Sequence, residues 1–391
     1  MRFSPLEGYV IAIKETLPEL ATREFEMLKN LQRIGVPCVE PFAVVKGRAD
    51  ENGEPLMAAL VTRHLKFSLP YRAMWSQGLR PETASRLVDA LALLLVRLHI
   101  VGFFWGDVSL SNTLFRRDAG AFAAYLVDAE TGQLYEDGLS QGQRENDLEI
   151  ARVNIAGELM DLVASGMAHA GVDPIQISAR IVAKYQELWT ALTGTEIFES
   201  NERWKISRRV QLLNDLGFDI GELSITNDES GNKVRIQPKV VDAGHHARRL
   251  LQLTGLDVEE NQARRLLNSI DEYRLKHQRP GADEEMLAHE WMSRVYEVVI
   301  GAIPVDLRGK LEPAEVFHQV LEHRWFMAEN QSRGIPLVEA VQSYVDNVLS
   351  HRRDEQTYLN QTTESIVLPE AVPTGTIIAV DDEETDWRDL V

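Results

Sequence analysis

The spacing of apolar residues in the first half of the chain predicts a small sheet followed by a long helix. Segments 8–14, 40–46 and 56–62 are short, apolar and bounded by turn or polar residues, which is typical of strands. Segments 20–31 and 81–99 instead repeat apolar residues every three or four positions, which predicts amphipathic helices. A proline opens the second of these helices, at a position that suits the first helical turn.

The rest of the chain again shows strands before helices. After the long helix, two short strands, two helices and a hairpin are predicted at 113–115, 125–127, 145–165, 175–193 and 222–226 with 233–240. The tetrapeptide from Asp257 to Glu260 is similar to a capping box, so a helix is expected to start there. Pro313 is expected to start another helix that runs to about Glu329. Strands first and helices later, twice over, predicts an α+β fold rather than a doubly wound parallel sheet.

Chain length and charge divide the sequence into three parts. A chain of 391 residues is long enough for two domains, and the boundary is expected near residues 195–201. We therefore predict a first domain at 1–195 and a mainly helical α+β domain at 196–363. The last part, 364–391, carries eight acidic residues against Arg388 alone and shows no helical period, so we predict a disordered acidic tail.

Composition excludes several classes of protein. The longest apolar runs are seven residues, 90–96 and 121–127, against the roughly 18–20 that a membrane-spanning helix needs. No signal-peptide pattern opens the chain, and Cys38 as the single cysteine excludes an intrachain disulfide and a cysteine-rich zinc site. A net charge of −19 has the wrong sign for nucleic-acid affinity. We expect a cytoplasmic protein with no membrane span and no nucleic-acid partner.

Three polar residues follow the long helix at a spacing that suits phosphoryl transfer. Asp107 precedes Asn112 by five residues on a predicted loop, so both side chains are able to reach one phosphate-sized site. Asp128 ends the next apolar strand. Amide and carboxylate oxygens are hard ligands of the kind that Mg²⁺ prefers, and phosphoryl transfer also needs a carboxylate that orients the attacking hydroxyl.

The same chemistry needs a positive charge on the nucleotide phosphates, and Lys14 is the candidate for it. Lys14 ends the first predicted strand, which places an ammonium at the edge of the small sheet. The helix that follows carries Glu24 and Glu26, and either glutamate is able to pair with the lysine and hold it in place. The order of these groups along the chain therefore matches the parts that a phosphotransferase requires.

At this point the chain resembles a known superfamily. The loop Gly106-Asp-Val-Ser-Leu-Ser-Asn112 resembles the catalytic loop of atypical protein-kinase-like folds, which reads His-Gly-Asp-Leu-Ser/His-x-x-Asn. These folds include the RIO kinases, aminoglycoside phosphotransferases and lipopolysaccharide kinases. Segment 23–31 with 35–37 is similar to their first helix and the strand entry after it, and 125–132 is similar to their metal-binding strand. The whole chain resembles a bacterial family in which a lipopolysaccharide-kinase-like domain precedes a C-terminal domain of unknown function.

The resemblance, which covers about residues 8–195, implies a bilobal fold and a set of site residues. The lobes are expected at about 1–68, where the N-terminal lobe is truncated, and at 69–195.

The cofactors implied are ATP and Mg²⁺. The implied roles are Asp107 as catalytic base, Lys14 on the α/β-phosphates, Glu24 as its partner, and Asn112 and Asp128 on the metal. Glu24 is favoured because the matching pattern is Glu-Phe-x-x-Leu, and Glu26 is the alternative. Asp147 is expected to brace the catalytic-loop backbone.

The chain departs from the pattern of this superfamily at three places, and from that of many other kinases at a fourth, Gly106. No glycine-rich strand–turn–strand precedes Lys14. Trp105 stands where the loop histidine is usual, and Gly106 stands where many kinases have arginine before the aspartate. Asp128-Ala-Glu130 replaces Asp-Phe-Gly, so an acid occupies a glycine position.

Two other groups of residues are predicted to be structural. Glu315 and His318 have the Glu-x-x-His spacing of carboxylate di-iron proteins, but the sequence holds no second such motif. We therefore predict that this stripe of the helix after Pro313 is a solvated face. Cys38 lies beside a predicted strand and is expected to be a small buried hydrophobic residue rather than a nucleophile.

The sequence supports one main hypothesis and two alternatives. The main hypothesis is an ATP- and Mg²⁺-dependent phosphotransferase that acts on a hydroxyl of an unknown acceptor. The first alternative is a pseudokinase scaffold or nucleotide-sensing protein, with the C-terminal helices or the acidic tail as the surface for a protein partner. The second is a helical adaptor in which the loop match is incidental.

Overall fold

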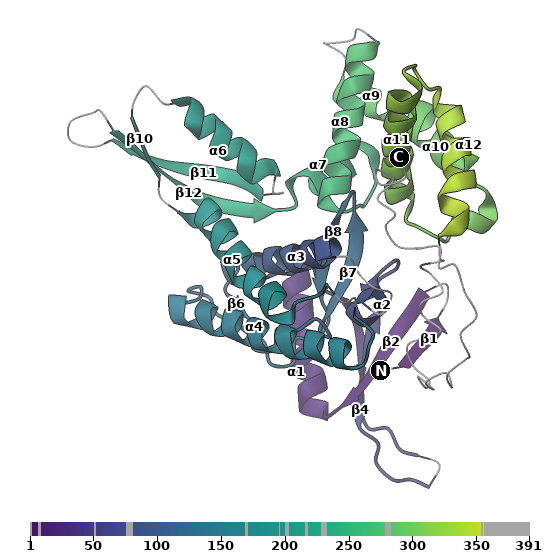
Figure 1. The fold of residues 1–391 in the computed structure, drawn as a ribbon. Coiled ribbons are helices and arrows are strands. Elements are labelled where there is room, and N and C mark those ends of the chain that lie inside the picture. Colours follow the sequence, from purple (N-terminus) through teal and green to yellow (C-terminus); the bar gives the residue numbers. More distant parts are fainter. Residues whose placement is uncertain are drawn as a thin grey trace.

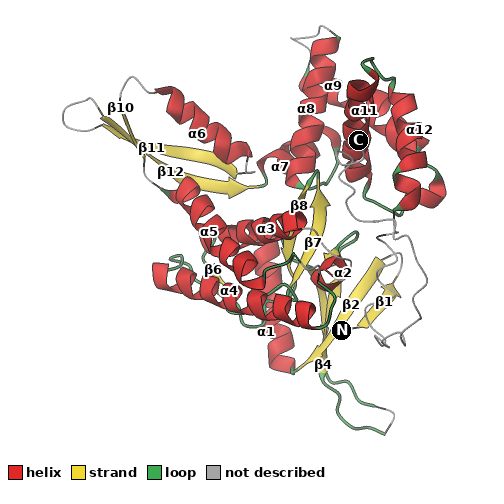
Figure 2. Cartoon of the chain, viewed as in Figure 1, coloured by secondary structure: helices red, strands yellow, loops and turns green. Residues whose placement is uncertain are grey.

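The computed structural model describes residues 2–6, 9–50, 52–75, 81–168, 171–194, 196–199, 203–215, 218–227, 233–277, 283–352 and 355. The N-terminal sheet and the C-terminal helices lie at opposite ends of the molecule, and a long hairpin projects from its side (Figure 1). Figure 2 shows strands in the N-terminal part and in the projecting hairpin, and helices in the C-terminal part, which agrees with the predicted α+β class. The predicted acidic tail at 364–391 lies outside the described residues.

An antiparallel sheet of four strands forms the N-terminal lobe. Its strands lie in the order β1-β2-β4-β3, with one helix inserted after the second strand. The bounds are β1 Arg2–Leu6, β2 Tyr9–Thr16, α1 Pro18–Arg33, β3 Glu40–Val45 and β4 Ala58–Arg63. The three predicted strands and the predicted helix are confirmed, whereas β1 was missed because its five residues include a proline and carry no clear alternation.

Helix α1 is held against this sheet by one apolar face. Pro18 occupies its first turn, where a missing backbone N–H costs nothing. Ala21, Leu28 and Leu31 are completely buried against β3 and β4, and each buried leucine contributes about 1.5–3 kcal/mol. The helix ends at Arg33, and Gly35 just beyond it has a φ of +75°, a conformation that glycine adopts without strain. This packing fixes the orientation of the helix face that carries Glu24.

The second lobe is built around one buried helix. The bounds of its elements are β5 Leu69–Pro70, α2 Tyr71–Trp75, α3 Pro81–Ile100, β6 Phe103–Phe104, β7 Thr113–Asp118, β8 Ala121–Leu126, β9 Gln133–Leu134, α4 Gln141–Ala164 and α5 Pro174–Thr193. Helix α3 packs between α5 and β8, and its apolar side chains are buried over most of its circumference. The predicted helices are confirmed, and the two short predicted strands are the ends of one longer hairpin, β7–β8.

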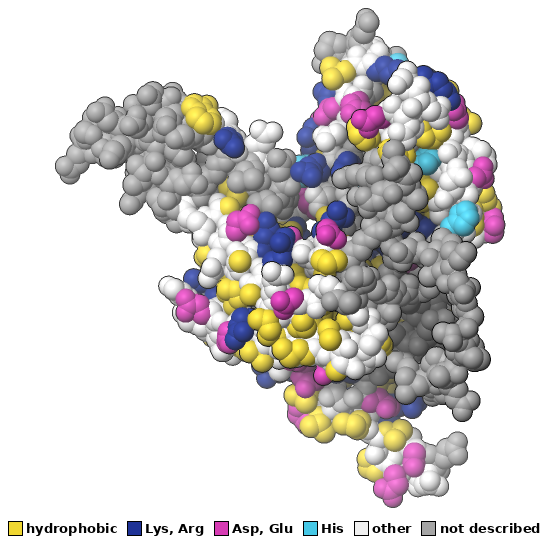
Figure 3. Space-filling model, in the orientation of Figure 1, with side chains coloured by type: hydrophobic (Ala, Val, Ile, Leu, Met, Phe, Trp, Pro, Cys, Tyr) yellow, Lys and Arg dark blue, Asp and Glu magenta, His cyan; other side chains and the backbone are white. Residues whose placement is uncertain are grey.

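Helix α4 carries apolar residues on two faces. One face contributes to the lobe's core through Ile155, Leu159 and other buried side chains. Val153 and Met160 lie on another face and are about half exposed, at 53% and 46%. Figure 3 shows apolar side chains gathered over this part of the molecule. The helix therefore both supports the interior and presents an apolar stripe at the surface.

A three-stranded antiparallel sheet with one helix follows, and it confirms the predicted hairpin. The bounds are β10 Glu196–Glu199, α6 Arg203–Asp215, β11 Phe218–Asn227 and β12 Lys233–Ala243. The strand order is β10-β12-β11. Leu213 and Phe218 are buried in the same apolar core as the helices of the second lobe, so this part of the chain is anchored to that lobe.

The remaining helices enclose a core of their own. The bounds are α7 His245–Thr254, α8 Glu260–Lys276, α9 Glu284–Trp291, a π-helical turn at Met292–Tyr296, α10 Glu297–Ala302, α11 Pro313–Gln331 and α12 Leu337–Asn347, with short 3₁₀ turns at Val305–Leu307 and Leu349–His351. Trp291, Phe317 and Tyr344 are the largest completely buried side chains of this core. Among the described residues, no helix combines the length and apolar character that crossing a membrane requires.

One prediction about these helices is wrong and another is partly right. A helix does start within the tetrapeptide 257–260, but its capping box is formed by Glu259 and Gln262 rather than by Asp257 and Glu260. The stripe with Glu315 and His318 is not solvated, because these side chains are only 3% and 4% exposed. The reason is the turn of the β7–β8 hairpin, which lies on this face of α11.

The burial of His64 predicts a loss of stability in mild acid. Its ring lies edge-on to Phe3 at 5.4 Å between centroids, and burial lowers the pKa of His64 from 6.5 to about 4. Between these two values the unfolded chain binds a proton that the folded chain does not, so the free energy of unfolding falls as the pH is lowered. We expect a loss of about 1–2 kcal/mol between pH 7 and pH 5 in urea titrations. His64→Gln is expected to remove this loss, and an equal loss in both proteins would contradict the assignment.

Candidate functional site

Strand pairing brings two of the predicted site residues to one end of a hairpin. In β7–β8, Thr113 lies opposite Leu126, so Asn112 and Val127 follow at the same end of the strand pair. The backbone N–H of Val127 donates to the carbonyl of Asn112 at 3.0 Å, which extends the ladder past the strands. Asp128 is the next residue. The register of the hairpin therefore determines how Asn112 and Asp128 lie relative to each other.

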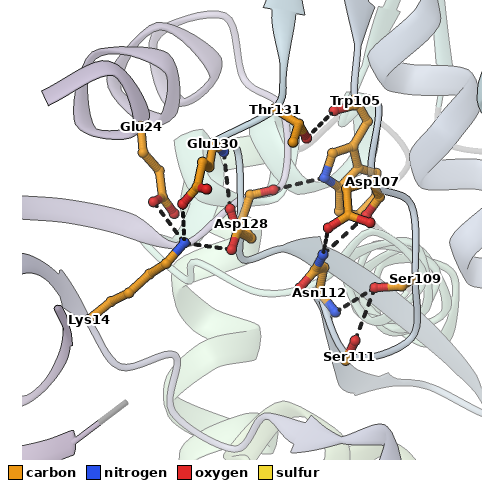
Figure 4. Close-up of polar contacts among 10 residues, drawn as sticks. All are labelled: Lys14, Glu24, Trp105, Asp107, Ser109, Ser111, Asn112, Asp128, Glu130 and Thr131. Carbon is orange, nitrogen blue, oxygen red and sulfur yellow. Dashed lines mark hydrogen bonds and ion pairs between the residues drawn. The ribbon is translucent and has the colours of Figure 1, made fainter. Parts of the chain in front are cut away.

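Lys14 lies at the centre of three carboxylates (Figure 4). Its ammonium is 2.6 Å from Asp128 Oδ2, 3.0 Å from Glu24 Oε2 and 3.1 Å from Glu130 Oε2. The lysine comes from β2, Glu24 from α1, and the two other acids from the segment after β8. Of the two glutamates considered on α1, Glu24 is the buried one that contacts Lys14, and Glu26 is exposed.

The charges in this cluster do not balance. Burial alone would lower the pKa of Lys14, but its hydrogen bond to Asp128 and the charge of Glu24 more than offset burial and raise that pKa, so the ammonium stays protonated. Burial, together with the charge of Asp128, raises the pKa of Glu24 to about 7 although Lys14 acts in the opposite direction. One ammonium therefore faces more negative charge than it neutralises.

This excess of carboxylate oxygen fits a divalent cation. Glu24, Asp128 and Glu130 each offer an oxygen, and these atoms lie within 4.8 Å of one another. Hard oxygen donors with net negative charge are what Mg²⁺ and Mn²⁺ select. The backbone N–H of Glu130 also donates to Asp128 Oδ1 at 3.0 Å, which fixes the orientation of that carboxylate. Of these three acids, the sequence analysis assigned only Asp128 to the metal; it gave Glu24 as the partner of Lys14 and assigned Glu130 no role in the site.

Asp107 is held by two amide side chains. Asn112 Nδ2 donates to Asp107 Oδ2 at 2.8 Å and to the Asp107 carbonyl at 3.1 Å, and Asn154 Nδ2 approaches Asp107 Oδ1 at 3.4 Å. Because the nitrogen of the Asn112 amide is engaged in this way, its oxygen is the atom that remains to serve as a ligand. Asn154 comes from α4, and its part in the site was not predicted from the sequence.

Asp147 braces the loop that carries Asp107, as expected. This carboxylate is completely buried and accepts from the backbone N–H groups of Trp105 and Gly106, both at 2.7 Å. Gly106 has a φ of +78°, and a Cβ there would lie 3.1 Å from the ring of Phe104. An arginine at this position would be strained, which explains one of the departures from the kinase pattern.

A buried histidine supports the brace from the other side. His99 Nε2 lies 3.1 Å from Asp147 and His99 Nδ1 lies 2.8 Å from the hydroxyl of Tyr185. Burial lowers the pKa of His99, despite the opposing effect of Asp147, so the ring is neutral. A neutral ring that donates from Nε2 to Asp147 must accept from Tyr185 at Nδ1. In the sequence, His99 is a single histidine at the end of an apolar helix. Such histidines are too common for the sequence to identify this one as a support of Asp147.

Trp105 links the loop to the segment after β8. Its side chain is completely buried, and its Nε1 donates to the carbonyl of Asp128 at 2.8 Å. The hydroxyl of Thr131 donates to the carbonyl of Trp105 at 2.8 Å. Tryptophan, in place of the usual histidine, therefore ties the loop to the segment after β8. Figure 4 draws two groups of contacts, one of Lys14 with Glu24 and Asp128 and one of Asp107 with Asn112, and Trp105 of the Asp107 loop bonds to Asp128.

Two families match the chain in the predicted order. Residues 14–152 match the lipopolysaccharide kinase (Kdo/WaaP) family, and residues 187–349 match a domain of unknown function, DUF4032. These matches confirm the resemblance stated from the sequence. The first match and the order of elements in both lobes also confirm that the N-terminal part has a kinase-like fold.

Solved structures of kinases show weaker likeness. WaaP in complex with acyl carrier protein is similar with a TM-score of 0.34 and 16% identity, covering 55% of this chain and 83% of that chain. The yeast RNA Pol II CTD kinase CTDK-1 complex is similar with a TM-score of 0.24 and 12% identity, covering 34% of this chain and 41% of that chain. No curated protein is significantly similar to the chain.

Removal of the Asp147 carboxylate is expected to loosen the loop. Asp147→Ala leaves the N–H groups of Trp105 and Gly106 without their acceptor, which predicts a loss of about 2–4 kcal/mol in the free energy of unfolding. Hydrogen exchange at these two amides should accelerate. Asp161→Ala, an exposed carboxylate of the same helix, is the control and should change neither quantity. Unchanged exchange in Asp147→Ala would show that other contacts hold the loop.

Proposed function

We propose that this chain, which joins a lipopolysaccharide-kinase-family domain to a DUF4032 domain, transfers phosphate from Mg-ATP to a hydroxyl group. The observation that carries the proposal is the presence of two polar pairs, Lys14 with Asp128 and Asp107 with Asn112, which Trp105 of the Asp107 loop links by its bond to Asp128. An ammonium, a metal-binding acid, a second acid and an amide are the parts that phosphoryl transfer requires. The acceptor is left open, because a fold does not define it.

In this proposal, Lys14 binds the nucleotide and Glu24 holds Lys14 in place. Lys14 binds the α/β-phosphates through its ammonium, which has to exchange part of its contact with Asp128 and Glu130 for phosphate oxygens. Glu24 is buried at 1% exposure and holds the lysine from the α1 side. A lysine whose aliphatic chain and ammonium are both held in place loses little conformational entropy when a phosphate binds, which favours nucleotide binding.

Asn112 and Asp128 would hold Mg²⁺, with Glu130 as an additional carboxylate beside them. When bound, Mg²⁺ neutralises charge on the phosphate oxygens and orients them for in-line transfer. Asp107 orients the acceptor hydroxyl and takes its proton. The amide contacts from Asn112 and Asn154 keep the Asp107 carboxylate in one orientation, so its free lone pairs point consistently toward the acceptor.

One observation favours the second candidate, a pseudokinase scaffold. Glu130 stands at a glycine position of the kinase pattern and contacts Lys14 at 3.1 Å. A carboxylate at that place competes with phosphate for the ammonium. In this alternative the chain does not turn over nucleotide and instead binds a protein partner through its C-terminal helices or its acidic tail.

Turnover of ATP tests the role of Asp107. A general base typically contributes a factor of about 10²–10⁴, so Asp107→Asn is expected to lower kcat at least 100-fold with little change in KM for ATP. ATP hydrolysis or autophosphorylation in Mg²⁺ measures this. Asp161→Asn, an exposed acid on α4, serves as the control. Equal rates for Asp107→Asn and the wild-type protein would refute the role.

Thermal stabilisation by Mg-ATP tests the nucleotide site and separates the two candidates. At a concentration of 100 Kd, a ligand stabilises the folded state by about 2.7 kcal/mol, which raises the Tm by several degrees. Lys14→Ala and Asp128→Ala should each abolish this shift, whereas Lys29→Ala, an exposed lysine of α1, should keep it. A shift without turnover would favour a nucleotide-sensing scaffold, and no shift in the wild-type protein would refute the enzyme.

A further inference from the structure

The β7–β8 hairpin connects the candidate site with the C-terminal helices. At one end of the hairpin the chain continues into Asn112 and Asp128. At the other end, the turn at residues 118–121 lies against α8 and α11, as Figure 1 shows for the ends of these strands and α8. Two short antiparallel strands thus join the residues proposed to bind metal to a separate helical core.

Asp118 caps helix α8 from a distant part of the chain. Its side chain is buried, and its carboxylate accepts from Asn261 Nδ2 at 2.8 Å, Gln262 N at 2.8 Å and Asn261 N at 3.2 Å. The N–H groups of the first helical turn have no partner within the helix, and the helix dipole favours a negative charge there. A carboxylate of the hairpin therefore adds to the capping box that Glu259 and Gln262 form at the start of α8.

Arg116 adds a second polar contact to the same interface. Its guanidinium donates to Glu259 at 2.8 Å and also to Glu312, the residue that precedes α11. The hydroxyl of Tyr125, on the neighbouring strand, donates to Glu259 at 2.6 Å. All these side chains are largely buried. Groups from both strands of the hairpin are thus tied to the starts of two helices.

The backbone of the turn is held as well. The N–H of Ala119 donates to Glu315 Oε2 at 2.9 Å, and Gln262 Nε2 donates to the carbonyl of Arg117 at 3.1 Å. Arg117 Nε in turn donates to Glu355 at 2.8 Å. These hydrogen bonds and ion pairs depend on the positions of particular atoms of the turn. A purely apolar contact would allow the hairpin to slide along the helices. A shift of either strand by one residue would leave several buried charges unpaired.

We infer that the C-terminal helices position the metal ligands of the N-terminal domain by holding the β7–β8 hairpin in place, with Asp118 and Arg116 as the positioning residues. The inference rests on the proposed function, because it assigns regulation of that same site to the DUF4032 part of the chain. Asp118 touches neither Asn112 nor Asp128; it acts through the strand pair between them. The C-terminal helices are then part of the phosphotransfer unit rather than an independent module.

Binding of Mn²⁺ in the presence of ADP tests the inference without turnover. Full-length wild-type protein, Asp118→Asn and Glu312→Gln are titrated with Mn²⁺, and free Mn²⁺ is followed by electron paramagnetic resonance. We expect binding about 10-fold weaker for Asp118→Asn and about 3-fold weaker for Glu312→Gln. Glu149→Gln, an exposed acid on α4 that pairs with Arg152, is the matched control and should bind as the wild type does. A purely structural role would lower the Tm but leave the Mn²⁺ affinity of the folded protein unchanged.

The outcomes separate the inference from the function on which it rests. If the wild-type protein binds neither Mn²⁺ nor ADP, the proposed function is overturned and this inference with it. If the wild-type protein binds both and the two variants bind Mn²⁺ equally well, the inference alone is overturned. Circular dichroism establishes that each variant is folded, and Glu312→Gln, which leaves the Asp118 cap intact, decides the result if Asp118→Asn does not fold.

Discussion

The structure depends on the backbone pairing of β7 with β8. This pairing places Asn112 and Asp128 at one end of the hairpin and Asp118 at the other. Successive side chains of a strand point to opposite faces of the sheet. Only one register of the pairing therefore gives the residues at both ends of the hairpin their observed contacts. The loop of Asp107 joins the hairpin through Asn112, and the helices that follow join it through Asp118. The proposed metal ligands and the contacts with the C-terminal helices thus lie on the same hairpin.

The second constraint is the charge at Lys14. Three carboxylates surround one ammonium, and the pKa of Glu24 rises to about 7 as a result of burial and of the negative charge beside it. Such a cluster gains free energy from added positive charge, which is why it suits a divalent cation with a nucleotide. It also explains how the chain tolerates Glu130 at a position where kinases have glycine, since the extra acid has a partner in Lys14.

Much of the site was predictable because its parts are local in the sequence. Lys14 and Glu24 lie on a strand and on the helix after it, and Asp107 and Asn112 share one loop, so element type and spacing were informative. The supporting groups were not predictable in this way. His99, Asn154 and other contacts of the loop come from helices that pack beside it, and an isolated polar residue on an amphipathic helix carries no signal of its partner.

The sequence by itself determined most of the longer elements, the α+β class and the kinase-like resemblance, because these follow from the period of apolar residues and from short motifs. Only the tertiary structure decided which distant group caps α8 and whether Glu315 is buried. Besides the capping box of Glu259 and Gln262, the first N–H groups of α8 bond to Asp118, which precedes Asn261 by 143 positions. Glu315 is buried because the turn of the hairpin lies on it. Pairings between distant residues are absent from local sequence patterns, so a helix face that binds another part of the chain has the same pattern as one that faces water.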